Sequence, residues 1–114
     1  MYNLFYGCSS LTSLNLSNFD TKNVKDMYGM FQFCKSLTSI DLSYFNTSSL
    51  NYMDYMFHFC PSLSYIDLST FNIKYDFPIS LFLDLPDTGI IKINKKIYDK
   101  SSNQIPPEWN VTIT

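Results

Sequence analysis

Arginine is missing from this 114-residue sequence, and its charged side chains leave a formal net charge of −2. Arginine is the side chain that grips phosphates and carboxylates with two parallel hydrogen bonds, and nucleic-acid binding relies on a basic surface. The composition therefore gives no reason to expect a nucleic-acid partner.

Long hydrophobic runs are missing too. No apolar stretch approaches the roughly 18–20 residues that span a bilayer, so we expect no transmembrane segment. The opening residues, MYNLFYGCSS, lack the basic start and the long apolar middle of a signal peptide. Hydrophobic residues still make up 46% of the chain, which is enough for one continuous core.

The sequence instead contains one phrase written three times. The copies read YGCSSLTSLNLSNFDTKNV, FCKSLTSIDLSYFNTSSL and HFCPSLSYIDLSTFNIKYD, and they align at a step of 26 residues. Met1, Met27 and Met53 share a register, so the sequence begins inside a repeat. A repeat of this length predicts an architecture of stacked units. The recurring positions are Cys8, Cys34 and Cys60; Leu11, Leu37 and Leu63; Leu14, Ile40 and Ile66; Leu16, Leu42 and Leu68; and Phe19, Phe45 and Phe71.

Each copy contains a strand pattern followed by a helical pattern. In Leu11-x-x-Leu14-x-Leu16, alternation turns Leu14 and Leu16 inward and the residues between them outward. The apolar residues then change spacing to three, three and one, which is typical of a helix. We therefore expect short helices over residues 24–31 and 50–57, with Asn23 and Ser49 as N-caps.

The third copy leads into a different ending. Ile79, Phe82 and Leu83 continue the helical stripe behind Pro78. The segment GIIKIN (89–94) predicts another strand, NKKIYDKSSNQI (94–105) a last helix, and WNVTIT (109–114) a closing strand. Lysines 92, 95, 96 and 100 either contact an anionic surface or protect an exposed strand edge, and edge protection is the favoured interpretation.

These patterns predict an α/β solenoid of the leucine-rich-repeat type. Short parallel strands would alternate with short helices over residues 1–85, and residues 86–114 would form a C-terminal strand cap of the same domain. A helical bundle is the rival fold. It would need longer helices, because an isolated helix of about eight residues is marginal.

The repeat closely resembles that of BspA-like leucine-rich-repeat surface proteins. Its motif is Met-Phe-x-x-Cys-x-Ser-Leu-x-x-Leu-Asp-Leu-Ser-x-Phe, seen here in MFQFCKSLTSIDLSYF, and IPPEWNV resembles the family's C-terminal closure. The resemblance implies a right-handed leucine-rich solenoid, a secreted or cell-surface location, and adhesion to host extracellular-matrix or cell-surface proteins. It implies no catalysis and no cofactor.

Candidate reactive residues favour structural roles. The three cysteines occupy the same place in successive repeats, so we expect a buried ladder of thiols rather than a zinc site or disulfides. His58 is the sole histidine and has no nucleophilic motif beside it, so a partly exposed turn position is expected. Asp41 and Asp67 lie at equivalent outward positions and could bind calcium, but a solvated row of acceptors is favoured.

The outward face of the strands is the predicted binding site for a protein partner, because solenoids bind macromolecules across such repeated surfaces. Its candidate residues are Ser13, Asn15, Ser17, Ser39, Asp41, Ser43, Tyr44, Tyr65, Asp67 and Ser69. No catalytic, cofactor-binding or metal-binding residue is expected.

Two functions fit the sequence better than an enzyme does. The first is a non-enzymatic binding or adhesion module that acts through the strand face. The second is a structural C-terminal fragment or truncated copy of a longer repeat protein without its own ligand. Since no earlier strand covers the first repeat, we also expect end-to-end self-association through that repeat.

Overall fold

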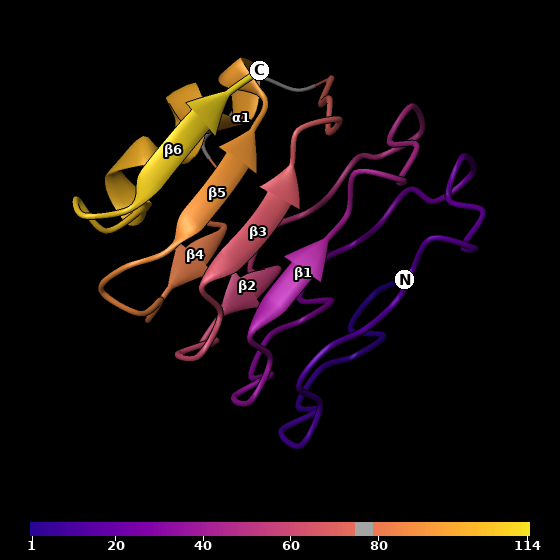
Figure 1. The fold of residues 1–114 in the computed structure, drawn as a ribbon. Coiled ribbons are helices and arrows are strands. Elements are labelled where there is room, and N and C mark those ends of the chain that lie inside the picture. Colours follow the sequence, from indigo (N-terminus) through magenta and orange to yellow (C-terminus); the bar gives the residue numbers. More distant parts are fainter. Residues whose placement is uncertain (75–78) are drawn as a thin grey trace.

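The computed structural model describes residues 1–74 and 79–114, so the expected helix start at Pro78 lies outside the described residues. The fold is mixed α/β with parallel strands and few helices (Figure 1). One sheet has the order β1-β3-β5-β6, and a smaller sheet pairs β2 with β4. The elements are β1 (Ser39–Asp41), β2 (Phe57–His58), β3 (Tyr65–Leu68), β4 (Phe82–Leu83), β5 (Ile90–Ile93), α1 (Lys95–Ser101), η1 (Ser102–Gln104) and β6 (Asn110–Ile113).

The strand register joins equivalent repeat positions. Ile40 of β1 lies opposite Ile66 of β3, Ile66 opposite Ile91 of β5, and Ile91 opposite Val111 of β6. The second and third copies of the repeat thus lie side by side in the sheet, and β5 (Ile90–Ile93) adds the next strand within the expected segment 89–94. The inward row of branched side chains continues across all four strands.

One hydrophobic core lies between the two sheets. It contains Ile40, Ile66 and Ile91 from the larger sheet and Phe57 and Phe82 from the smaller one. In Figure 1 the smaller sheet lies behind the larger one.

A row of stacked phenylalanine rings runs through this core, formed by equivalent residues of the repeats. Phe5 stacks on Phe31 with ring centroids 5.6 Å apart, and Phe31 stacks on Phe57 at 5.7 Å. Phe57 in turn stacks on Phe82 at 5.7 Å. The repeat therefore places like side chains in direct contact across successive copies.

The expected helices over residues 24–31 and 50–57 are wrong. We call residues 1–8, 27–34, 53–60 and 79–85 the back segments, and these run as turns and short strands behind the core. Their N–H groups bond to the next repeat: Phe5 N donates to Met30 O at 2.9 Å, and Phe31 N donates to Met56 O at 3.0 Å. The apolar residues of these segments are therefore buried by backbone hydrogen bonding between successive repeats, and no helix is needed to place them on one side.

Left-handed residues explain why no helix forms there. The backbone φ angle is +61° at Gly29 and +62° at Phe33, and the equivalent residues of the third copy, Tyr55 and Phe59, have φ of +61° and +60°. A right-handed helix cannot pass through such residues. Asn23 and Ser49 consequently cap no helix.

The first copy of the expected strand is also missing. Residues 11–16 have irregular backbone, although Thr38 N donates to Thr12 O at 3.0 Å and holds the first repeat beside the second. The corresponding residues 39–41 form β1, which pairs with β3 on its other side. Residues 11–16 lie beside β1, but they do not form the regular hydrogen-bonded pairing with β1 that would make them a strand.

Buried threonines join neighbouring repeats, a feature that the sequence interpretation missed. The Thr47 hydroxyl donates to Asn72 O at 3.1 Å and accepts from Asn72 N at 2.9 Å. Thr21 makes the same pair of bonds with Asn46. Since the threonines themselves are buried, each hydroxyl satisfies two backbone groups at the core boundary.

The C-terminal prediction is confirmed in its elements. Residues 94–105 contain α1 and η1, with Asn94 as the N-cap that accepts from Lys96 N, and β6 closes the sheet. The Gln104 side chain accepts from Leu81 N and Phe82 N, at 2.7 and 3.0 Å. In the earlier repeats, such N–H groups donate to carbonyl oxygens of the following back segment, and here the Gln104 side chain supplies the acceptor instead.

Edge protection by the four lysines is wrong. Lys92 lies on β5, which has strands on both sides, and Lys95 and Lys100 lie on α1. Lys96 donates from its ammonium group to Ile73 O at 2.9 Å. The edge strands of the larger sheet are β1 and β6, and neither contains a lysine.

Candidate functional site

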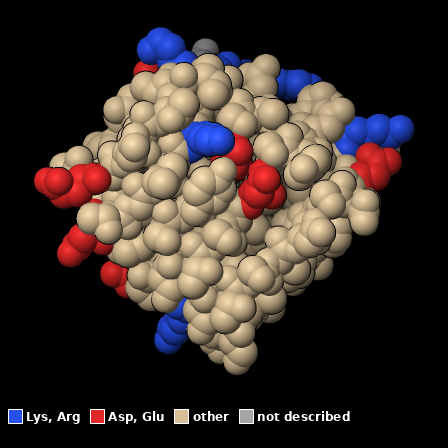
Figure 2. Space-filling model, in the orientation of Figure 1, with Lys and Arg blue, Asp and Glu red and all other residues tan. Residues whose placement is uncertain are grey.

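The candidate site is the outer face of the larger sheet, which we call the strand face. Ser13, Asn15, Ser17, Asp41 and Tyr44 are exposed there as predicted, while Ser39, Ser43, Tyr65 and Ser69 are half-buried. Figure 2 views the molecule from this side and shows acidic and basic atoms side by side in the middle of a surface that is otherwise largely uncharged.

Asparagine, aspartate and serine on this face shape the turns after the strands. Asp41 Oδ1 accepts from Ser43 N at 2.9 Å and from Ser43 Oγ at 2.6 Å. Asn15 makes the same two contacts with Ser17, at 3.0 and 2.7 Å. These are local turns of the Asx type, so the repeated Asp/Asn-x-Ser spacing has a structural role before any role in binding. The second oxygen of Asp41 has no part in this turn.

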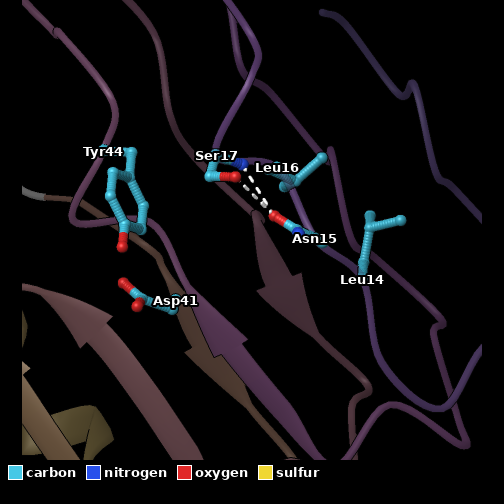
Figure 3. Close-up of a pocket in the computed structure, with 6 residues that line it drawn as sticks. All are labelled: Leu14, Asn15, Leu16, Ser17, Asp41 and Tyr44. Carbon is cyan, nitrogen blue, oxygen red and sulfur yellow. Dashed lines mark hydrogen bonds between the residues drawn. The ribbon is translucent and has the colours of Figure 1, made fainter.

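A hollow of about 320 Å³ opens where the first repeat lies beside β1. Its walls come from both repeats: Leu14, Asn15, Leu16 and Ser17 on one side, and Asp41 and Tyr44 on the other. Figure 3 shows the Tyr44 hydroxyl group pointing toward the Asp41 carboxylate, while the Leu14 and Leu16 side chains point away from both. Tyr44 is 64% exposed, so much of its ring is accessible to a partner.

This hollow combines one negative charge with one exposed aromatic ring, while Leu16 in its wall is only 2% exposed and belongs to the core. A carboxylate and a ring face both attract cations. A lysine or arginine side chain of a partner protein matches that combination. The hollow lies where residues 11–16, which have irregular backbone, run beside β1.

Asp67 differs from the prediction, because only 6% of its surface is exposed. Its Oδ1 accepts from Ser69 N at 2.9 Å, as in the other repeats. The register places Asp67 between Asp41 of β1 and Lys92 of β5. A lysine in this row reduces the negative potential that a calcium ion would need. In residues 1–74 and 79–114, no group of three metal-ligating side chains is arranged to hold an ion.

His58 is buried, so the expected partly exposed position is wrong. Its Nε2 lies 3.1 Å from Ser80 Oγ, a contact between residues 22 positions apart that no sequence motif indicated. Burial lowers the pKa of His58, which favours the neutral imidazole. His58 lies in β2 and Ser80 just before β4, so the contact ties the two back segments together.

The cysteine ladder is confirmed for its two inner members. Cys34 and Cys60 are fully buried, all three cysteines are free thiols, and Cys8 is half-buried. The Cys34 and Cys60 thiols donate to Phe5 O and Phe31 O, each at 3.1 Å. Burial, reinforced by the neighbouring thiol, raises the pKa of Cys34 to about 11 and that of Cys60 to about 12. Both are therefore protonated and poorly nucleophilic at neutral pH.

The fold and the face together define a mixed α/β repeat protein with an open, mostly polar sheet surface. A family model described as "Mycoplasma protein of unknown function, DUF285" matches residues 1–79. The chain belongs to this family, which is related to the BspA-like surface proteins. No curated protein and no solved structure matched the chain. In the part of the chain that the structure describes, no helix has the length and apolar character needed to cross a bilayer.

Proposed function

We propose that the chain is a non-enzymatic protein-binding module of a leucine-rich-repeat solenoid, acting through its strand face at the cell surface. The partner is a host extracellular-matrix or cell-surface protein that presents a basic side chain to the hollow. The observation that carries this proposal is the hollow between the first repeat and β1, where Asp41 and Tyr44 are both exposed.

Three features support binding over catalysis. The strand face offers an exposed tyrosine ring, a typical anchor for a protein partner, beside an exposed carboxylate. The thiols are buried and have raised pKa values, so they are poor nucleophiles. The single imidazole is buried and serves to join β2 with the segment before β4.

The test is a binding titration against immobilised extracellular-matrix glycoproteins. Tyr44→Ala removes the exposed ring and should weaken binding about tenfold, as loss of an aromatic anchor typically does. Asp41→Asn should weaken binding about threefold at low salt, because one exposed charge contributes little and is screened. The Asn side chain keeps the turn, since Asn15 makes the same contacts with Ser17.

A matched control is Asp20→Asn, which removes an exposed carboxylate whose Oδ1 accepts from Lys22 N. This variant should bind like the unmodified protein. Failure of the unmodified protein to bind any member of the panel would favour the structural-fragment function. If Tyr44→Ala and Asp41→Asn both bind as tightly as the unmodified protein, the hollow is not the binding site.

A further inference from the structure

Three tyrosine rings lie in contact across the back segments, and we call Tyr2, Tyr28 and Tyr55 the tyrosine row. Tyr2 stacks on Tyr28 with ring centroids 5.4 Å apart and an angle of 14° between the ring planes. Tyr28 meets Tyr55 edge to face, with ring centroids 5.1 Å apart. Each of the three residues belongs to a different repeat, so Tyr28 lies between the phenols of the back segments before and after its own.

The tyrosine row is open to solvent. Tyr2 is 61% exposed and Tyr55 is 37% exposed, while Tyr28 between them is half-buried. Tyr44 and Tyr52 are exposed too, but within residues 1–74 and 79–114 no other aromatic ring pairs with either of them. The tyrosine row therefore differs from these exposed tyrosines because it holds phenols against one another.

Most of the sulfur-containing side chains, which oxidants also attack, are shielded in the core. Met1 and Cys8 are half-buried, and the other thiols and thioethers have no exposed surface. Oxidation of sulfur follows exposure, so these buried groups react slowly while the protein is folded. The exposed phenols are consequently among the side chains that an oxidant in solution reaches first. The fully buried sulfur-containing residues are Met27, Met30, Cys34, Met53, Met56 and Cys60.

We propose that the tyrosine row is an oxidative cross-linking site, where a peroxidase acting with hydrogen peroxide joins Tyr28 to Tyr2 or Tyr55. The oxidant removes one electron and one proton from the O–H group of each of two neighbouring phenols. The two phenoxyl radicals couple through ring carbons beside the hydroxyl groups, and the hydrogens on those carbons move to the oxygens, which restores both phenols. The pair of tyrosines thus loses two hydrogen atoms to form one carbon–carbon bond, and the peroxide is reduced to two water molecules.

The fold favours coupling within one chain over coupling between chains. The rings are already in contact, and holding two reacting groups together makes their reaction effectively unimolecular. The new bond would tie two adjacent repeats together and restrict the unfolded chain, as a disulfide does. The back segments lie behind the core and the strand face lies on the outer side of the larger sheet, so this inference does not depend on the proposed binding function.

The test treats the dilute protein with a peroxidase and hydrogen peroxide, and then measures the mass of the monomer and the fluorescence of coupled tyrosine. Tyr28→Phe keeps the ring but removes the phenol O–H, so the fold should persist, and far-UV circular dichroism checks it. Tyr52→Phe is the matched control, because Tyr52 is 54% exposed. Cleavage after lysines releases residues 26–35, in which Tyr28 is the only tyrosine, so mass spectrometry of linked peptides identifies the site.

We expect the unmodified protein and Tyr52→Phe to give a monomer lighter by two hydrogen atoms, with Tyr28 in the linked peptide and a urea midpoint shifted upward. Tyr28→Phe should lose this product, as should the double variant Tyr2→Phe/Tyr55→Phe, because both leave no pair of neighbouring phenols in the row. A monomer of unchanged mass, while free tyrosine couples under the same conditions, would overturn the proposal. So would a link within the chain that persists in Tyr28→Phe, or coupling that yields linked dimers alone.

Discussion

Replacing Phe57 by alanine should lower the free energy of unfolding by about 4 kcal/mol, the middle of the range for a buried phenylalanine. Phe57 is fully buried, and its ring stacks on Phe31 and on Phe82, both at centroid distances of 5.7 Å. The substitution leaves a cavity in the middle of the row and removes both stacked pairs. Since small domains are stable by only about 5–15 kcal/mol, most of the margin would be lost. Urea unfolding followed by circular dichroism measures the change.

Phe5→Ala is the matched control at the open end of the same row. Phe5 is half-buried and stacks on Phe31 alone, at 5.6 Å, so its loss should cost about 1–2 kcal/mol. Equal losses from the two substitutions would mean that the ring row does not pass through a common core.

Trp109→Ala is the second substitution with a large expected effect, again about 4 kcal/mol. The indole is 6% exposed, and its Nε1 donates to Pro86 O at 2.8 Å. A Cβ placed on Gly89 would lie 2.6 Å from the indole ring, so the ring rests directly on the backbone before β5. Losing the ring removes a nearly buried apolar contact just before the closing strand.

Two further variants test the hydrogen bond and the fit of the ring. Trp109→Phe keeps a six-membered ring but loses the five-membered ring of the indole and its N–H donor, so it should cost about 2 kcal/mol, less than Trp109→Ala. Gly89→Ala keeps the tryptophan but pushes a methyl group against it, and should cost about 1–3 kcal/mol. Urea unfolding measures the free energy of unfolding of each variant. If Trp109→Ala leaves that free energy unchanged, the C-terminal segment is not docked through this residue.

The parts of the fold that follow from the register could be predicted from the sequence. A 26-residue step aligns Ile40 with Ile66, and the structure pairs these two residues. The strand over Ile90–Ile93, the helix after Asn94 and the closing strand were also predictable, because alternation and an N-cap residue mark them locally. The inner two members of the cysteine ladder follow from the same repeat.

The back segments could not be predicted from apolar spacing alone. Apolar residues spaced three and one apart fit one side of a helix. The same spacing also fits a chain that turns at residues with positive φ angles, as this one does. Gly29 gives a hint of such a turn, yet Phe33, Tyr55 and Phe59 adopt the same conformation with no signal in their residue type. Neighbouring repeats impose that conformation through hydrogen bonds such as Phe33 N to His58 O, at 2.9 Å.

Within the candidate site, the exposed positions of Asp41 and Tyr44 were predicted correctly, and the burial of Asp67 was not. Alternation tells which face a side chain occupies, but not how far neighbours on that face cover it. The contact between His58 and Ser80 depends on two segments meeting across the smaller sheet. Thr21 and Thr47 did carry a signal, since they are 26 residues apart in equivalent places and both are buried.

Hydrogen exchange of three equivalent amides tests most directly whether the repeats stack about one core. Phe5, Phe31 and Phe57 each donate to the next back segment, at 2.9, 3.0 and 3.1 Å, so their bonds are nearly identical. Only the surroundings differ, because Phe31 and Phe57 are buried and Phe5 is half-buried. Local stability follows buried contacts, so the Phe31 and Phe57 amides should exchange about a hundredfold more slowly than the Phe5 amide. Equal exchange at all three amides, or fast exchange at Phe31 and Phe57, would contradict the stacked arrangement.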